Sequence, residues 1–401
     1  MKVLILTEFY APAWAFGGPP KVISGIGSEL VRRGHSVAVI TANVLDAHDE
    51  VRKREQVIDG VEVTYLRTWS RWLAWNHKIF VPKGLRKSLG KNAKNYDVIL
   101  LASFRTIFSW LGYRYARKFG IPYVILPYGT LPRAGRAKRV LKFMIDQFYG
   151  HRTLRDASAV LAQTEHEMQE AKKFGAREAN TRLVPLHIDM SEFEKLPQKG
   201  SFRKKIGVSS NEKVILFLGR LHKYKGLDLL LESFSLMVQT HDDWRLVIVG
   251  RDDGYQTKML KLIKTLRLEN KALFVGPLYE KDRIEAYVDA DVFVMPSSHF
   301  EETSTAALEA CASHTPVIVT KQASIPGLDE YKAGFTINYN SEELKNAVST
   351  ILSDTKLGTK MGENARRMIE EKFTLSGVTN QIEKILQTTE RSADALKKVG
   401  D

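Results

Sequence analysis

The segment VFVMPSSHFEETSTAALEACASHTPVIVT, residues 292–320, decides the fold of the chain around it. It begins with an apolar strand, Val292 to Met295, and continues through a Pro-Ser-Ser turn and a short polar loop. An alanine-rich helix follows and ends near His314, before a second apolar strand. Short apolar runs separated by a helix are typical of strands buried in a parallel sheet. The segment therefore predicts a strand-loop-helix-strand unit of an α/β protein.

Acids and the start of the helix make this segment a candidate ligand site. Glu301 lies in the loop and Glu309 about two turns into the helix, so both can face one ligand. Ser304 and Thr305 stand at the helix start, where the first amides lack internal acceptors and can receive a diphosphate. Alternatively, Glu301 and Glu302 only complement the helix dipole, and Glu309 is a solvated surface residue.

A second segment upstream supplies cations. In KVILFLGRLHKYKGLDLL, residues 213–230, an apolar strand runs into Gly219 and Arg220, and Lys225 precedes the next helix. A strand-to-helix loop is the usual ligand position of a parallel α/β sheet. Each cation alone fits an ordinary surface charge. Together with the acidic loop, the two cations indicate a binding site.

The combined pattern is GR-x4-KG followed about eighty residues later by PS-x3-E-x7-EA-x4-TPVI. It resembles the large retaining glycosyltransferase family that includes sucrose synthase and the bacterial phosphatidylinositol mannosyltransferases, and the likeness extends over most of the chain. The resemblance implies that Arg220 and Lys225 hold the donor diphosphate. It also implies that Glu301 contacts the donor sugar and that Glu309 holds the ribose hydroxyls.

The resemblance implies an α/β fold of two doubly wound Rossmann-like domains facing across a cleft, the glycosyltransferase-B fold. Regular alternation of strands and helices along the chain favours the same class. We expect an acceptor-binding domain over residues 1–188 and a nucleotide-sugar-binding domain over 189–375. A C-terminal helix and tail over 376–401 are expected to cross back toward the first domain.

The chain departs from the family pattern at several positions. Glu302-Thr303-Ser304 stands where relatives usually have Gly-Phe-Gly, and Ser313-His314 where Cys-Gly or Ala-Gly is common. Tyr128 occupies a position that is His in many relatives, and we assign it with Arg133 to acceptor binding. These departures fall at the sugar pocket, so the resemblance does not identify the donor sugar.

The N-terminal stretch MKVLILTEFYAPAWAFGGPPK opens the first domain. Lys2 to Thr7 reads as a central parallel strand, and the helix predicted from about Lys21 to Arg33 follows Gly17 and Gly18. These glycines allow close backbone approach to a ligand; in relatives this loop lies over the donor phosphates. His35 reads as a structural residue at the helix end. The apolar run is too short for a signal or a membrane span, which favours a cytoplasmic protein.

The positive charge of the chain is concentrated in one block. The formal net charge is +14, and seventeen Lys and Arg but only one acid, Asp97, lie between Val63 and Ile145. Trp69, Trp72 and Trp75 recur every three residues within it. Tryptophans beside cations favour an anionic membrane surface. The alternative is a Trp stripe packed in the core with a solvated basic face.

Cysteine and aspartate patterns give little support to redox or metal chemistry. The single cysteine, Cys311, lies in an apolar run and reads as a buried inert thiol, and a reducing compartment is favoured. Asp289 and Asp291 resemble a metal-binding triplet, but their place between a helix and a strand favours capping. Asp252 and Asp253 contact the nucleotide or cap the next helix. We assign no metal and no cofactor beyond a nucleoside diphosphate sugar as donor substrate.

Three functions remain compatible with the sequence. The first is retaining, metal-independent transfer of a hexose to a glycan or lipid-linked acceptor in cell-surface polysaccharide or glycan synthesis, by a protein peripheral on the inner face of the membrane. The second is a sugar-nucleotide epimerase of the same fold. The third, a non-catalytic nucleic-acid-binding protein, follows from charge alone and leaves Glu301 and Glu309 unexplained. We therefore expect a nucleotide sugar and an acceptor as partners, and no nucleic acid.

Overall fold

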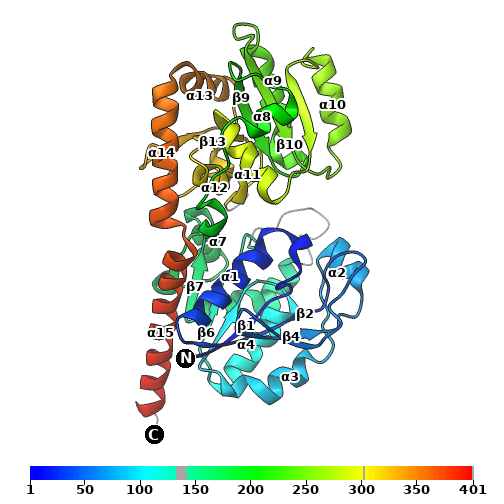
Figure 1. The fold of residues 1–401 in the computed structure, drawn as a ribbon. Coiled ribbons are helices and arrows are strands. Elements are labelled where there is room, and N and C mark those ends of the chain that lie inside the picture. Colours follow the sequence, from blue (N-terminus) through cyan, green and yellow to red (C-terminus); the bar gives the residue numbers. More distant parts are fainter. Residues whose placement is uncertain (132–141, 301–302, 400–401) are drawn as a thin grey trace. The chain divides into compact units, whose positions relative to one another are not determined.

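The computed structural model describes residues 1–131, 142–300 and 303–399, with side chains described as far as residue 390. The chain divides into two compact units (Figure 1). Unit 1 comprises Met1–His187 together with Leu375–Asp401, and unit 2 comprises Ile188–Thr374. Each unit contains its own sheet.

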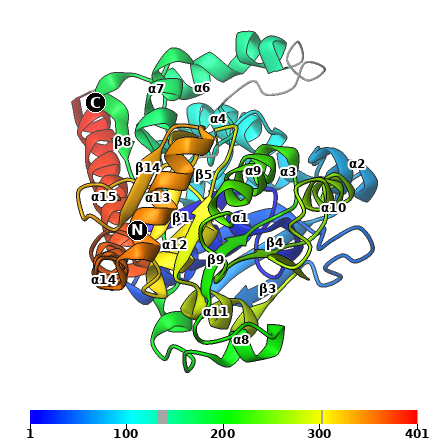
Figure 2. The ribbon, with the colours of Figure 1, turned by 90° about the horizontal axis from the view of Figure 1, so that it is seen from above.

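Unit 1 is built on an eight-stranded sheet with the order β3-β4-β2-β1-β5-β6-β7-β8, and Figure 2 shows β3 and β8 at its opposite edges. The strands are β1 (Lys2–Leu6), β2 (Ser36–Ala42), β3 (Glu55–Ile58), β4 (Val61–Leu66), β5 (Val98–Leu101), β6 (Tyr123–Ile125), β7 (Ala159–Ala162) and β8 (Thr181–Leu183). Only the pairing of β3 with β4 is antiparallel among the described strands. Since neighbouring parallel strands end at one edge, the loops that follow them share that edge.

Helices cover both faces of this sheet. They are α1 (Gly18–Arg32), α2 (Arg71–His77), α3 (Leu85–Asn92), α4 (Ile107–Phe119), α6 (His151–Arg155), α7 (Glu165–Lys173) and α15 (Leu375–Val399). Leu4 and Leu6 of β1 join the core cluster under α3 and α4. Helices α1 and α15 contact each other away from that cluster. Burial of β1 on both faces explains why Lys2–Leu6 is apolar after its first residue.

Helix α15, the last of the chain, is docked on unit 1 by charged contacts with the end of α1 (Figure 1). Arg33 lies 3.0 Å from Glu383 and donates to the carbonyl of Ser376 at 2.8 Å. His35 Nε2 lies 2.9 Å from the same Glu383 carboxylate. The structural role predicted for His35 is therefore confirmed.

Unit 2 contains a six-stranded parallel sheet with the order β11-β10-β9-β12-β13-β14. The strands are β9 (Lys213–Leu218), β10 (Trp244–Val249), β11 (Ala272–Gly276), β12 (Val292–Met295), β13 (Val317–Thr320) and β14 (Gly334–Ile337). The chain passes from β9 outward to β11 and then returns to β12 on the other side of β9. The strand order therefore reverses between β9 and β12, the position where open α/β sheets bind ligands.

The helices of unit 2 alternate with its strands. They are α8 (Ser201–Ile206), α9 (Leu227–Met237), α10 (Gln256–Thr265), α11 (Glu280–Asp289), α12 (Thr305–Ala312), α13 (Ser341–Ser353) and α14 (Thr355–Lys372). All four residues of β12 are completely buried, which confirms the strand predicted at Val292–Met295. Cys311 is a buried free thiol, and burial raises its pKa, as expected for an inert core residue.

The aspartates that resembled a metal triplet have structural partners. The carboxylate of Asp289 accepts hydrogen bonds from the amides of Phe202, at 2.7 Å, and Arg203, at 3.0 Å, in the first turn of α8. Asp291 accepts the amide of Val214 at 2.8 Å and pairs with the Arg203 guanidinium at 2.6 Å. A structural role is confirmed for both, but the helix that Asp289 caps lies almost ninety positions earlier in the chain, and Asp291 binds a strand amide and an arginine.

Candidate functional site

Two loops of unit 2 that carry the predicted donor residues leave the sheet side by side. One follows β9 and the other follows β12, and these strands are hydrogen-bonded neighbours. The amide of Ser298 donates to the carbonyl of Tyr224 at 2.9 Å, which ties the loops together. Gly226 has a φ of +68°, and a Cβ there would lie 1.8 Å from the Pro296 carbonyl oxygen. Only glycine fits this contact, so the KG element of the motif brings the loops into register.

The two predicted cations lie on the first of these loops. Arg220 follows Gly219 at the end of β9, and its guanidinium pairs with Asp253 at 2.5 Å while remaining largely exposed. Lys225 ends the short 3-10 helix that precedes Gly226 and is half-buried. Burial lowers the pKa of His222 between them; Asp253 opposes this shift, and the cations nearby reinforce it. The loop therefore presents a positive field at the switch point of the sheet.

The start of α12 lies on the second loop. Ser304 is the N-cap residue, and its Oγ accepts the amide of Ala307 at 3.4 Å. Thr305 is the first helical residue. The hydroxyl of Thr303 is buried and has no hydrogen-bond partner in the described part of the chain. An unsatisfied buried hydroxyl beside free helix amides indicates a polar ligand here.

Glu309 is not a solvated surface residue, contrary to the alternative raised from the sequence. Its Oε2 accepts the hydroxyl of Tyr287 at 3.0 Å and lies 3.3 Å from Nε of Arg283. Arg283 also pairs with Glu192. Burial raises the pKa of the Tyr287 hydroxyl, which therefore stays a neutral donor to the carboxylate. Two side chains of α11 thus orient Glu309.

Some predicted residues lie outside the described part of the chain. These are Glu301, which the resemblance assigned to the donor sugar, its neighbour Glu302, and Arg133, assigned to the acceptor. Residues 142–145, which follow the undescribed stretch, are helical, and a π-helical turn, η3 (Asp146–Gly150), continues this helix into α6.

Asp252 and Asp253 have separate roles in unit 2. Asp252 Oδ1 accepts the amides of Tyr255 and Gln256, each at 3.0 Å, at the start of α10. Capping is thus the observed role of Asp252, whereas Asp253 pairs with Arg220. The sequence left Asp253 as either a nucleotide contact or a helix cap, and in the structure it positions Arg220 instead.

The predicted glycines of unit 1 start α1 at the carboxyl edge of its sheet. Gly17 is the N-cap residue with a φ of +93°, and the space next to its Cα is open. Gly18 is the first helical residue and is followed by Pro19 and Pro20, so the helix begins three residues before the predicted Lys21. Backbone approach by a ligand is therefore sterically free at Gly17.

Glu8 was missed by the sequence analysis and lies at the same edge, two residues after β1. It is almost completely buried, and its Oε1 accepts the hydroxyl of Ser103, which follows β5, at 2.8 Å. Burial raises the pKa of Glu8, while hydrogen bonds from Thr106 and Ser103 oppose that rise. A charged residue directly after a buried strand is the sequence signal that points to it.

Tyr128, at the position that is His in many relatives, stands in a strained turn after β6. Its φ is +49°, and its buried hydroxyl has no partner in the described part of the chain. Burial raises the pKa of this hydroxyl, and so does nearby Glu167. The Glu167 carboxylate accepts the amide of Gly129 at 2.7 Å and braces the turn. Strain and an unsatisfied hydroxyl together mark Tyr128 as a candidate ligand contact.

The turn after β6 is also held from the β5 side. Arg105, itself at a φ of +62°, donates to the carbonyls of Thr130 at 2.6 Å and Leu131 at 2.7 Å. Its guanidinium pairs with the buried Asp146 at 2.6 Å. These contacts join loops from two neighbouring strands, so the position of Tyr128 is built by tertiary contacts.

The structure thus gathers the predicted residues into two sets. Gly219, Arg220, Lys225, Ser304, Thr305 and Glu309 belong to unit 2, and Gly17, Gly18 and Tyr128 belong to unit 1. Within the described residues, no group of three or more His, Cys, Asp and Glu is arranged to hold a metal ion. No helix in the described ranges is long and apolar enough to cross a membrane.

Two family models match the chain and together span most of it. The model of glycosyl transferases group 1 matches residues 198–368, and that of the glycosyl transferase 4-like domain matches residues 17–187. An uncharacterized glycosyltransferase, MJ1607, of Methanocaldococcus jannaschii is 27% identical over 390 residues, covering 95% of this chain and 96% of the relative. The α-monoglucosyldiacylglycerol synthase of Streptococcus pneumoniae is 24% identical, with coverage of 96% and 88%.

Solved structures resemble the fold over nearly the whole chain. Sucrose-phosphate synthase from Thermosynechococcus elongatus superimposes with a TM-score of 0.74 at 19% identity, covering 98% of this chain and all of the other. HepE of Anabaena, solved with UDP and glucose, gives 0.72 at 20% identity, with coverage of 96% and 99%.

Proposed function

The chain belongs to the glycosyl transferases group 1 family and has the glycosyltransferase-B fold, and on that premise we propose which transfer reaction it performs. It moves a hexose from a nucleoside diphosphate sugar to a hydroxyl of a glycan or lipid-linked acceptor, with retention of configuration at the anomeric carbon. The nucleotide sugar is supported by solved structures of HepE, which hold UDP and UDP-glucose.

One observation carries the proposal: the loops after β9 and β12 share the switch point of the unit 2 sheet. Arg220 and Lys225 lie on one loop, and the free amides at the start of α12 lie on the other. A diphosphate placed between them meets two cations and a helix N-terminus. As the glycosidic bond breaks, negative charge builds on the departing diphosphate, and these fixed groups stabilise it.

Glu309 is assigned to the ribose of the donor. Tyr287 and Arg283 fix its carboxylate on α12, and a fixed carboxylate accepts hydrogen bonds from the two ribose hydroxyls without further ordering. Glu301 is assigned to the donor sugar by family resemblance. Because the positive field comes from Arg220, Lys225 and helix amides, the reaction is proposed to need no metal ion.

The acceptor is proposed to be membrane-borne, as in cell-surface polysaccharide or glycan synthesis, with the protein peripheral on the cytoplasmic face. Trp69 is 71% exposed and Trp72 63% exposed, so the alternative of a Trp stripe in the core is wrong for both. Trp75 instead packs edge-on against Phe16, with ring centroids 5.3 Å apart. Two exposed tryptophans within the basic block 63–145 fit an anionic membrane surface. A relative named as a glucosyldiacylglycerol synthase supports a lipid acceptor.

The reaction is tested by incubating the protein with single nucleotide sugars, with and without glycan and lipid-linked acceptors, and resolving the products and their anomeric configuration. We expect one donor to raise the Tm and to be consumed only with an acceptor. A donor converted to its epimer without acceptor would instead support the epimerase.

Membrane docking is tested separately by sedimentation with anionic and neutral liposomes at low and high salt. We expect binding to anionic liposomes that falls at high salt. Substitution of Trp69 and Trp72 by Ser should abolish it, whereas substitution of the partly buried Trp75, which packs against Phe16, tests the fold instead. A folded, donor-binding sample that binds neither liposome would point to a soluble acceptor. Salt-sensitive RNA retention on filters would support the nucleic-acid alternative.

A further inference from the structure

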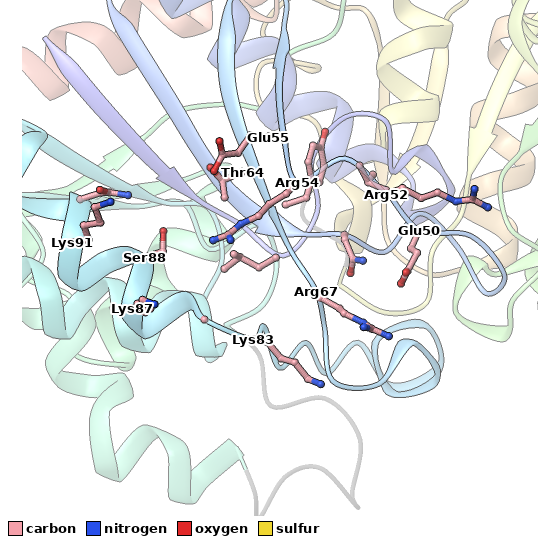
Figure 3. A pocket seen from close by; sticks show the side chains of 16 residues that line it. Glu50, Arg52, Arg54, Glu55, Thr64, Arg67, Lys83, Lys87, Ser88 and Lys91 are labelled. Carbon is pink, nitrogen blue, oxygen red and sulfur yellow. The ribbon is translucent and has the colours of Figure 1, made fainter.

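A basic cavity of about 910 Å³ opens in unit 1 where β2 and β4 end. Six cations and two carboxylates, Glu50 and Glu55, line it (Figure 3). The six cations are Arg52, Arg54, Arg67, Lys83, Lys87 and Lys91. Its volume is in the range of small-molecule sites, roughly 300–1,000 Å³. Neither Arg52 nor Arg54 belongs to the basic block that the sequence singled out.

Three separate stretches of chain bring these cations together. Arg54 precedes β3, and its carbonyl accepts the amide of Tyr65 in β4 at 2.7 Å. The carbonyl of Arg67, directly after β4, accepts the amide of Lys83 at 2.8 Å. Figure 3 shows Arg54 extending toward α3, whose Lys87 and Lys91 stand on the facing side, with Arg67 and Lys83 farther along the cavity.

The cations of this cavity are not neutralised by the protein. In the part of the chain that the structure describes, none of the six forms an ion pair, and neither do Glu50 and Glu55. Lys87 and Lys91 are four residues apart on α3, a spacing at which like charges destabilise a helix. Elsewhere cations find partners, as Lys205 does with Asp282 and Glu285. A cluster of unpaired cations that disfavours its own helix is suited to an anionic ligand.

An exposed apolar surface adjoins the cavity. Arg67 and Lys83 flank residues 68–82, and a bridge between Thr68 and Pro82 closes this excursion. The excursion carries the exposed Trp69 and Trp72. A ligand that extends from the cavity past Arg67 and Lys83 therefore meets an apolar surface.

We propose that this cavity binds the phosphate of a ligand other than the sugar donor. A phosphate monoester or diphosphate fits the donor set, because its oxygens accept charge-assisted hydrogen bonds from guanidinium and ammonium groups on several sides. Arg54 on one wall of the cavity and Lys87 with Lys91 on the other bind the phosphate. Arg67 and Lys83 contact the part of the ligand next to the phosphate. The cavity is lined by residues of unit 1, whereas Arg220 and Lys225 belong to unit 2.

The first test is calorimetric titration of the whole protein with inorganic pyrophosphate, which both sites can bind. The variant Lys87→Gln with Lys91→Gln removes two cations from the cavity. Its control, Arg86→Gln with Lys94→Gln, removes two exposed cations from the same stretch that do not line it. A third variant, Arg220→Ala with Lys225→Ala, removes the donor-site cations and leaves the cavity intact.

We expect two classes of pyrophosphate sites in the unmodified protein. The cavity variant should weaken one class about tenfold, the control should change it less than about twofold, and the donor-site variant should weaken only the other. Equal weakening of pyrophosphate binding in the cavity variant and in its control would show that the loss follows from net charge alone. That result would overturn the proposal. A single class of pyrophosphate sites that disappears in the donor-site variant would also overturn the proposal. That result would leave the proposed transfer reaction unaffected.

A second test distinguishes a lipid from a soluble ligand. Vesicles of phosphatidylcholine with phosphatidic acid, a phosphate monoester, are compared with vesicles in which phosphatidylglycerol replaces the phosphatidic acid. Stronger binding to phosphatidic acid, lost in the cavity variant and displaced by pyrophosphate, supports the site with a lipid-borne phosphate. If the variant loses pyrophosphate binding but still binds vesicles as before, the site is supported and its ligand is a soluble phosphate compound. Unchanged binding of both probes would contradict it.

Discussion

The charged groups at the switch point of unit 2 and those in the basic cavity of unit 1 follow opposite rules. At the switch point, Arg220 pairs with Asp253, and Glu309 contacts Arg283 and Tyr287. In the described part of the basic cavity, none of the six cations has an acidic partner. Pairing holds a side chain in one geometry, whereas unpaired cations keep a strong positive field for an incoming anion. The contrast separates a site built for positioning from one built for attraction.

The largest effect should come from the cations of the switch point. Arg220→Ala and Lys225→Ala should each lower kcat by about 10²–10³, because each removes a fixed stabiliser of the departing diphosphate. Lys223→Ala is the matched control, since Lys223 is exposed on the same loop and lies over the ring of Tyr224. Steady-state kinetics and circular dichroism of all three variants make the measurement. Near-normal turnover in both site variants would show that Arg220 and Lys225 do not stabilise the departing diphosphate. The switch point would then not differ from the basic cavity in the way described above.

Joining of the two loops should be almost as sensitive. Gly226→Ala should lower the free energy of unfolding by about 2–3 kcal/mol and weaken donor binding, because its Cβ would overlap the Pro296 carbonyl. Gly254→Ala, also at positive φ but in open space, should cost only about 1 kcal/mol. Urea unfolding of both variants tests this, and equal losses would show that backbone strain alone, and not the loop contact, matters.

The two acids of the motif should separate by ligand. Glu309→Gln should weaken a nucleoside diphosphate about tenfold, because Glu309 is assigned to the ribose. Glu301→Gln should weaken only the complete sugar nucleotide. Calorimetry with both ligands measures the difference, and Tyr287→Phe should act in the same direction as Glu309→Gln because it removes the hydrogen bond that orients this acid. Equal losses for both acid variants with both ligands would contradict the assignment.

Paired charge also fixes α15 on unit 1, and its effect should be smaller and depend on pH. The hydrogen bond to His35, with help from Arg33, lowers the pKa of Glu383. Since the pKa is lower in the folded state, the contribution is present above the ordinary Glu value, near 4.5, and is lost as the pH falls through the lowered value. We expect Glu383→Gln to cost about 1 kcal/mol at pH 7 and nothing near pH 2. Urea unfolding across this range measures it; a cost independent of pH would exclude charge pairing as its cause.

The smallest effect should come from removing metal ions. Transfer in excess EDTA should match transfer without it, because Arg220, Lys225 and the helix amides supply the positive field. Initial rates in EDTA, and again after addition of Mg²⁺ or Mn²⁺, provide the measurement. A rate abolished by the chelator and restored by either ion would show that the switch point is incomplete without a metal.

The sequence alone determined the α/β class and the location of the candidate site in unit 2. Runs such as Val292–Met295 are so apolar that only burial on both faces suits them, and the motif residues directly follow such strands. The edge strand β3, Glu55–Ile58, escaped the analysis because half of it is exposed and it lacks an apolar run. Strand β14 and helices α2 and α3 were not anticipated either; α3 is polar on most of its surface.

Tertiary structure alone decided which charges are paired and which are buried. Asp289 caps a helix that begins at Ser201, Glu8 is enclosed by groups that follow β5, and Arg54 lines the same cavity as Lys87. Local sequence patterns carry the period of a strand or helix, because that period is a property of the backbone. The partner and the burial of a charge depend on residues far along the chain, so they emerge only when the sheet brings its strand ends together.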